Sequence, residues 1–251
     1  MLTPMLPYQL VVFDMAGTTV QDNHEVEDCF YEAAVQTGLE ATRSRINAMH
    51  GIPKKIVIET LWDEYIGKGH PEFETKVEAT FAAFKTILET HYLTHPVRPT
   101  IAAIETFAWL KSQGVKIALN TGFYREVVNI ILQRLGWDHN LDENYLGNAD
   151  SIIDLSLTPS ETGGKGRPHP DMILKAMQIF DIEDPRKVVK IGDTPSDLQE
   201  GKLAGVGLNL AVTSGSHTRE ELEVWENDGL MDSLAELPAL MLEKSAILNA
   251  G

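Results

Sequence analysis

Residues Tyr8–Val20 read YQLVVFDMAGTTV and contain the clearest strand pattern of this 251-residue chain. The stretch begins with a short apolar run that includes two adjacent valines, and such runs are typical of a buried strand. The run ends at a carboxylate, Asp14, and the residues after it are small and polar. We therefore expect a central strand with an acid at its carboxyl end.

Four more apolar runs follow farther along the chain. Two are strong and two are weaker: Val115–Leu119 and Lys187–Ile191, then Ile152–Leu157 and Leu208–Val212. Amphipathic helical patterns lie between them, at Ile101–Gln113, Arg125–Leu135 and Asp171–Phe180. Because strands and helices alternate, we predict a doubly wound parallel sheet, an α/β fold of the Rossmann-like kind.

The segment from residue 21 to residue 97 interrupts this alternation. It contains no convincing strand, and its apolar residues recur at the three-to-four spacing of helices. Helices are expected at His24–Thr37, Pro53–Trp62 and Glu72–Tyr92. We therefore predict an α/β core made of residues 1–20 and 98–251, with an all-helical cap inserted at residues 21–97.

Composition excludes several classes of protein. Lys and Arg number 21 and Asp and Glu 37, so the formal charge of 21 − 37 = −16 argues against a nucleic-acid-binding protein. One cysteine, Cys29, excludes an intramolecular disulfide framework. Neither a signal peptide nor an apolar membrane span is evident, so we expect a cytoplasmic protein without a membrane partner.

Polar residues follow three of the expected strands where those strands end. They are Asp14, then Thr121 with Gly122, then Asp193 with Asp197, and a polar cluster at 163–169 (GGKGRPH) precedes a helix. In open α/β sheets, ligands bind outside the carboxyl ends of the strands. We expect these four groups to converge on one site.

The residue types suit phosphoryl transfer, which mainly needs positioning and charge neutralisation. The Asp14 carboxylate can act as a nucleophile and form an aspartyl-phosphate. Asp14 and Asp193 are hard oxygen ligands that suit Mg²⁺. The Thr121 hydroxyl and the backbone N–H of Gly122 can contact the phosphoryl group, and Arg167 can neutralise both the nucleophile and that group.

These four segments resemble the four motifs of the haloacid dehalogenase superfamily, and their order and spacing also match. The matching segments are Asp14–Val20 (DMAGTTV), Asn120–Gly122 (NTG), Gly166–Pro170 (GRPHP) and Gly192–Asp197 (GDTPSD). The helical insert lies where that superfamily carries one type of cap. The resemblance therefore implies a Mg²⁺-dependent hydrolase that acts on a small phosphorylated or phosphonate substrate.

The first motif is similar to that of the phosphonoacetaldehyde hydrolase (phosphonatase) branch. Most phosphatases of the superfamily have a second Asp as general acid, whereas this chain has Ala16, and Arg167 stands where a Lys is usual. The resemblance implies that Asp14 is the nucleophile and that Mg²⁺ is held by Asp14, the Ala16 carbonyl and Asp193, with Asp197 in the metal shell. It also implies that Thr18, Thr121, Gly122 and Arg167 contact the phosphoryl group.

The missing general acid at position 16 matters less when the leaving group needs no proton, as is the case for an enamine. An amine that forms a Schiff base with an aldehyde would create such a leaving group. In phosphonatases this lysine comes three residues after a cap glycine, which selects Lys54 after Gly51. We expect Lys54 to contact substrate, either as the Schiff-base amine or only as a binding group.

Three positions depart from the phosphonatase pattern. Val57 replaces a cap His, Phe123 replaces a Tyr, and His24 replaces a Cys, although His24 could still polarise water or substrate. The chain is therefore expected to be a phosphonatase-like hydrolase. The alternative is a phosphatase of a small phosphate monoester, phosphoglycolate-like or sugar-phosphate-like. A remote alternative is a non-catalytic sensor of a phosphorylated metabolite. A monomer or a homodimer is expected.

Overall fold

A parallel sheet of six strands forms the centre of the protein in a computed structural model that describes residues 6–250, and side chains as far as residue 246. The sheet has the order β3-β2-β1-β4-β5-β6. Its strands are β1 (Leu10–Phe13), β2 (Lys116–Asn120), β3 (Leu155–Leu157), β4 (Val188–Gly192), β5 (Leu208–Val212) and β6 (Gly229–Met231). The predicted parallel α/β fold is confirmed. The first five residues of the predicted core segment and Gly251 lie outside the described residues.

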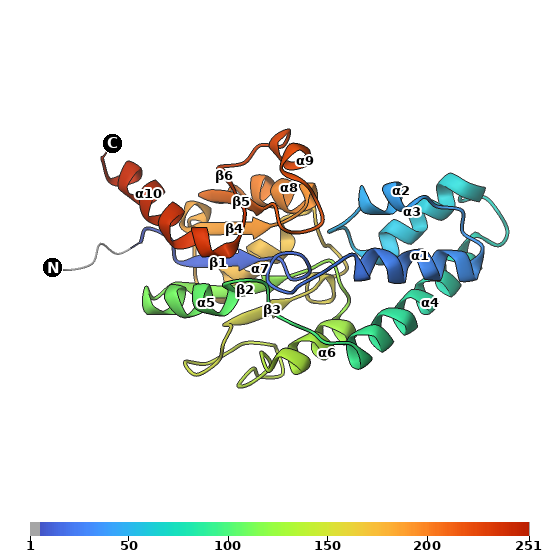
Figure 1. Ribbon diagram of the computed structural model, residues 1–251, viewed down its shortest axis with the longest axis horizontal. Helices are drawn as coiled ribbons and strands as arrows, with labels where there is room; N and C mark the ends of the chain where they lie inside the picture. Colours follow the sequence, from blue (N-terminus) through green and yellow to red (C-terminus); the bar gives the residue numbers. More distant parts are fainter. Residues whose placement is uncertain (1–5, 251) are drawn as a thin grey trace.

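Helices cover both faces of this sheet (Figure 1). The α-helices of this part are α5 (Ala103–Ser112), α6 (Arg125–Leu135), α7 (Asp171–Ile179), α8 (Pro195–Ala204), α9 (Arg219–Glu223) and α10 (Leu237–Ala250). Three short 3₁₀ helices join them: η1 (Pro159–Thr162), η2 (Pro185–Lys187) and η3 (Leu234–Glu236).

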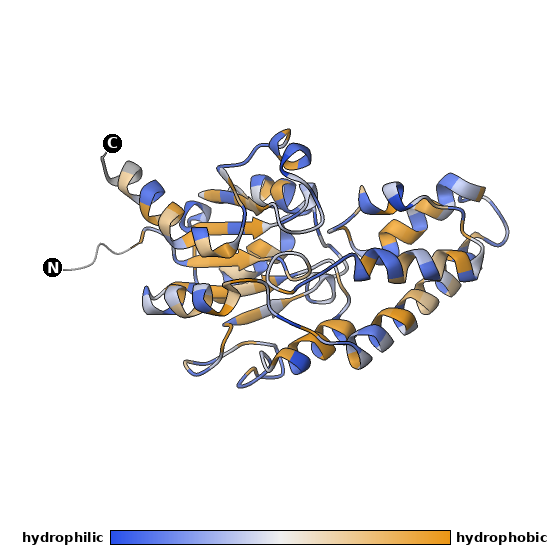
Figure 2. Cartoon of the chain, viewed as in Figure 1, coloured by the Kyte–Doolittle hydropathy of each residue, from blue (hydrophilic) through white to orange (hydrophobic). Residues whose placement is uncertain are grey.

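The central strand β1 is buried on both faces, which explains its continuous apolar run. Val11 and Phe13 pack into the layer that contains α5, α6 and α10, whereas Leu10 and Val12 pack into the layer that contains α7 and α8. This alternation follows from the two-residue period of a strand. Figure 2 shows the strands as the most hydrophobic part of the protein, flanked by helices with mixed faces.

Four helices form a separate lobe beyond the carboxyl ends of the strands (Figure 1). They are α1 (Glu25–Thr37), α2 (Arg43–Asn47), α3 (Lys54–Ile66) and α4 (Phe73–Thr94). Helix α4 packs on α1 and α3 and also contacts α6 of the core. We call this lobe the cap. Its limits at residues 21 and 97 remain a prediction. Within residues 6–250, no helix combines the length and the apolar character that crossing a membrane requires.

The structure differs from the predicted elements at a few places. Strand β6 and helices α2, α8 and α10 were not predicted. Strand β3 starts only at Leu155, three residues later than the apolar run suggests. The reason is Asp154, whose carboxylate accepts the Ile117 N–H at 2.9 Å in place of a backbone carbonyl.

Candidate active site

Three loops that follow neighbouring strands bring the core residues of the site together. Phe13 of β1 pairs with Leu119 of β2 on one side and with Ile191 of β4 on the other. Asp14 therefore emerges between the loop that starts at Thr121 and the loop that starts at Asp193, and all three residues are buried. The register of the strands therefore brings these residues together at one edge of the sheet, as predicted.

Arg167 links two of the carboxylates in this site. Its guanidinium donates to Asp14 Oδ1 at 2.7 Å and also to Asp197 Oδ1, and the side chain is almost fully buried. Although burial opposes the charge, Asp14 and Asp197 raise the pKa of Arg167 above its usual value. Arg167 therefore stays a fixed positive charge beside the Asp14 carboxylate.

Asp14, Asp193 and Asp197 form a compact acidic group, with one oxygen of each carboxylate within 4.8 Å of the others. Among the described residues, Asp193 receives hydrogen bonds only from uncharged donors: Ser216 N–H and Oγ at 2.7 Å, and Thr18 Oγ1 at 3.4 Å. Burial, followed by the charges of Asp14 and Asp197, raises the pKa of Asp193 well above its usual range. A buried carboxylate with only uncharged donors fits a site for a divalent cation, because a cation would supply the missing positive charge.

The backbone at Gly17 shapes the loop around Asp193. Gly17 has a φ of +85°, and a Cβ atom there would lie 2.2 Å from Asp193 Oδ2. Any side chain at this position would collide with the carboxylate. The glycine of the first motif is therefore required both by its left-handed backbone and by this close approach.

A buried polar network supports the site from below. Lys190, in the middle of β4, donates to Asn120 Oδ1 at 2.7 Å and pairs with Asp197 at 2.9 Å and Glu200 at 3.2 Å. Against the effect of burial, Arg167 and Lys190 lower the pKa of Asp197 to about 2. Lys190 and Glu200 were not predicted; a lysine inside an apolar strand run was the available indication.

The cap contributes Lys54, the first residue of α3, to a cavity of about 340 Å³ above the strand ends. The cavity is lined by Asp14, Ala16, Asp22, Val26, His50, Gly51, Lys54, Thr121, Gly122, Phe123, Arg167, Thr194 and Ser216. Lys54 is only 7% exposed. Burial and the charge of Arg167 lower its pKa to about 8. The amine is therefore neutral far more often near pH 7 to 8 than an ordinary lysine.

Backbone atoms of the cap and the core meet directly at this cavity. A Cβ atom at Gly122 would lie 2.6 Å from the Gly51 carbonyl oxygen and 3.0 Å from that of Ile52. A Cβ atom at Gly51, where φ is +81°, would lie 2.6 Å from Thr194 Oγ1. The cap is thus closed onto the core, and Gly51 and Gly122 make this approach possible.

Two residues that were expected to bind substrate lie away from the cavity. The His24 side chain is 71% exposed, faces Glu27 at 3.8 Å, and is not among the lining residues. Thr18 lies behind the site and donates to Asp193. Val57, which stands where the phosphonatase pattern has a cap histidine, is buried in the apolar part of the cap.

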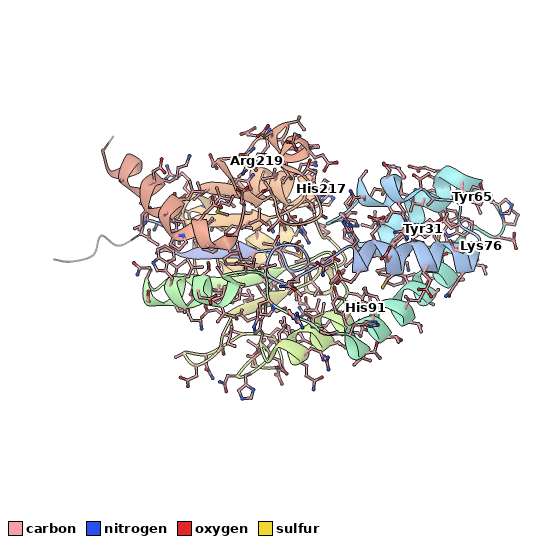
Figure 3. The ribbon with its side chains drawn as sticks, in the orientation of Figure 1. Tyr31, Tyr65, Lys76, His91, His217 and Arg219 are labelled. Atoms are coloured by element: carbon pink, nitrogen blue, oxygen red, sulfur yellow. The ribbon has the colours of Figure 1, made fainter. Side chains whose placement is uncertain are left out.

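Two residues that sequence reasoning missed, Asp22 and His50, line the cavity. The ring of His50 faces that of His217 with centroids 6.5 Å apart, and Figure 3 shows His217 at the edge of the core nearest the cap. Burial, followed by Lys54, lowers the pKa of His50 to about 2. Its position next to Gly51 was the indication that could have identified it.

Comparisons with known sequences identify relatives of this chain. The family model of haloacid dehalogenase-like hydrolases matches residues 8–205. A bifunctional phosphonoacetaldehyde hydrolase/aminoethylphosphonate transaminase of Clostridioides difficile is 30% identical over 88% of this chain, which spans 34% of that longer protein. The phosphonoacetaldehyde hydrolase of Vibrio parahaemolyticus is 25% identical, over 98% of this chain and 97% of its own length.

Solved structures show the same fold. A phosphonoacetaldehyde hydrolase-like protein from Oleispira antarctica superposes with a TM-score of 0.76 at 18% identity, over 98% of this chain and 96% of its own. A protein described as a predicted phosphoglycolate phosphatase from Haemophilus somnus has a TM-score of 0.72 at 18% identity, over 94% of this chain and 99% of its own. The chain therefore belongs to the haloacid dehalogenase-like hydrolase family.

Proposed function

We propose that this protein is a Mg²⁺-dependent phosphonatase that cleaves the P–C bond of phosphonoacetaldehyde. The observation that carries the proposal is the buried amine of Lys54, whose pKa is lowered to about 8 and which shares one cavity with the Asp14 carboxylate. Amines of lowered pKa are the ones suited to Schiff-base chemistry. The names of the curated relatives support the same substrate.

The core residues divide the work on the phosphoryl group. Asp14 attacks phosphorus, while Arg167 and Thr121 hold the phosphoryl oxygens in place. The Asp14 and Asp193 carboxylates and the Ala16 carbonyl would hold Mg²⁺, with Asp197 beside them. Bound there, the ion would neutralise charge between the nucleophile and the phosphoryl oxygens. The covalent aspartyl-phosphate on Asp14 is then hydrolysed by water.

Lys54 prepares the leaving group. Its neutral amine adds to the aldehyde carbon, and loss of water gives a protonated imine. When the P–C bond breaks, its electron pair passes toward the imine nitrogen and forms an enamine, which needs no proton at the moment of departure. The absence of a carboxylate at Ala16 is consistent with this reaction, because no alkoxide has to be protonated.

Borohydride trapping tests the proposal. Wild-type protein treated with phosphonoacetaldehyde, Mg²⁺ and borohydride should carry a reduced adduct on Lys54 alone. Lys55 is the internal control, because it is 45% exposed and pairs with Glu78 at 2.6 Å outside the cavity. Lys54→Arg should lose the adduct and lose turnover by on the order of 10²-fold or more, whereas Lys55→Arg should keep both. An active wild-type enzyme without a Lys54 adduct would reject the imine.

One departure from the phosphonatase pattern favours a second function, the hydrolysis of a small phosphate monoester. Val57 supplies no imidazole to the cavity and packs inside the cap, so one proton-transfer group of the phosphonatase pattern is missing there. In this second function Lys54 only binds substrate. Turnover of phosphoglycolate that exceeds turnover of phosphonoacetaldehyde, with no adduct on Lys54, would favour this function over the first.

A further inference from the structure

Asp22 lies in the segment that leads from the core into helix α1 of the cap, and it borders two cavities. One is the catalytic cavity that contains Asp14 and Lys54. The other, of about 670 Å³, lies beside it and is lined by Gln21 and Asn23, among other residues. The Asp22 carboxyl thus lies between the reacting groups and a second, larger space.

The other titratable side chains that line the catalytic cavity already have a task or cannot exchange a proton. Asp14 is the nucleophile and Lys54 is the amine. Arg167 keeps its charge at any ordinary pH. His50 stays neutral, since burial and Lys54 lower its pKa to about 2. Among the described residues of this cavity, Asp22 is the group left for proton transfer.

The surroundings of Asp22 suit a carboxyl that keeps its proton. Its side chain hydrogen-bonds to Glu25, whereas the Val26 N–H, which donates to Asp22 Oδ1 at 3.3 Å, favours the ionised form. Burial, followed by the hydrogen bond and the charge of Glu25, raises the pKa of Asp22 to about 7. Lys54 is the cation that acts on it in the opposite sense. Groups with a pKa near the working pH are the most effective acid–base catalysts.

We propose that Asp22 is the acid–base residue of the Lys54 imine chemistry, a role that nothing else in the cavity fills. This inference rests on the proposed function. After Lys54 adds to the aldehyde, the Asp22 carboxyl gives its proton to the carbinolamine hydroxyl. The C–O bond breaks, water leaves, and the nitrogen lone pair forms the C=N bond. The Asp22 carboxylate then lies beside a positively charged imine.

After the P–C bond has broken, the enamine carbon takes a proton from water, which gives the positively charged imine again. The hydroxide left behind is neutralised by the proton that hydrolysis of the aspartyl-phosphate releases. The reverse of imine formation then restores the enzyme. Water adds to the imine carbon and gives a proton to the Asp22 carboxylate, and the carbinolamine then collapses to free aldehyde and the Lys54 amine. Proton and charge therefore balance over the imine cycle. The second cavity, with the polar side chains of Gln21 and Asn23, offers Asp22 contact with water that does not pass the nucleophile.

Two substrates separate this role from a structural one. Phosphonoacetaldehyde needs the imine, whereas p-nitrophenyl phosphate has a leaving group that departs without a proton and needs only the core residues. Asp22→Asn should lower kcat/KM for phosphonoacetaldehyde by about 10²–10⁴-fold, the usual contribution of a general acid or base, and that for p-nitrophenyl phosphate far less. Asp22→Glu should recover part of the loss. The matched control is Asp28→Asn, since the Asp28 side chain is 62% exposed and lies outside the catalytic cavity.

Each outcome decides between an acid–base role and a structural role of Asp22. An equal loss on both substrates in Asp22→Asn, or no loss on phosphonoacetaldehyde, would overturn the inference while the proposed function stands. A wild-type enzyme that hydrolyses p-nitrophenyl phosphate but not phosphonoacetaldehyde would overturn the proposed function, and the inference with it. Loss on phosphonoacetaldehyde alone, with slower borohydride trapping of Lys54, is the result that we expect.

Discussion

Asp14 and Arg167 depend on each other because both are almost fully buried. Burial raises the pKa of the Asp14 carboxyl, while Arg167, which donates to it at 2.7 Å, acts in the opposite direction. Without the guanidinium, a nucleophilic carboxylate would be costly in this place. The arginine thus favours the charged form of the nucleophile against the effect of burial.

Asp14→Asn should abolish turnover and preserve the fold. The amide has nearly the same volume and its oxygen can still accept from Arg167, but it is a poor nucleophile. We expect kcat to fall on the order of 10³-fold or more, as for other nucleophile deletions. Steady-state assays with phosphonoacetaldehyde and thermal unfolding together check this. A variant that keeps most of its activity would contradict a mechanism through an aspartyl-phosphate.

Residues at strand ends could be predicted, and residues in the cap loops could not. Asp14 and Thr121 follow apolar runs whose direction in a parallel sheet determines where they meet. Asp22 and His50 lie in loops without periodicity, and only the closure of the cap onto the core brings them into the cavity. His24, chosen by its distance from Asp14 in the sequence, has a left-handed backbone and an exposed side chain.

At the scale of elements, the long and regular segments were the predictable ones. Helix α6 runs over Arg125–Leu135, as its apolar spacing predicts. Strand β6 is three residues long and begins with a glycine, so no pattern marks it. It pairs with β5 at the edge of the sheet, and its place follows from the tertiary structure. Short edge elements are thus set by contacts that a local pattern does not contain.

Closure of the cap predicts the effect of Gly122→Ala. The added Cβ atom would meet the carbonyl oxygens of Gly51 and Ile52, so the cap should no longer close fully over the strand ends. Displacement by about 1 Å can cost on the order of 10²-fold, and we expect a loss of kcat/KM of that order. Lys54 should also react faster with amine-directed reagents.

Gly69→Ala is the matched control for this variant. Gly69 lies in the cap, and a Cβ atom there would have no atom within 4 Å. Its activity and the labelling rate of Lys54 should stay at the wild-type values. Equal activity of Gly122→Ala and Gly69→Ala would show that closure to this distance is not needed for turnover.

At the scale of the whole molecule, the charge of −16 has a local counterpart beneath the cavity. Six of the buried charged groups lie together there, four carboxylates and two cations: Asp14, Asp193, Asp197 and Glu200 with Arg167 and Lys190. The formal sum is −4 + 2 = −2, the charge that one divalent cation neutralises. The protein can therefore be acidic overall and still attract an anionic substrate once a metal is bound.

The buried charge predicts an opposite effect of Asp193→Asn with and without metal. Because the pKa of Asp193 is raised in the folded protein, its ionised form opposes folding. This cost in folding free energy is absent at pH values below the usual pKa range of a carboxyl group and grows as the pH rises through that range. In EDTA at neutral pH the variant should thus unfold at a higher temperature than wild type. Excess Mg²⁺ should stabilise wild type, by about 2.7 kcal/mol at a hundred times the dissociation constant, and leave the variant unchanged. Asp28→Asn should respond to Mg²⁺ as wild type does, and an Mg²⁺ response retained in Asp193→Asn would place the metal elsewhere.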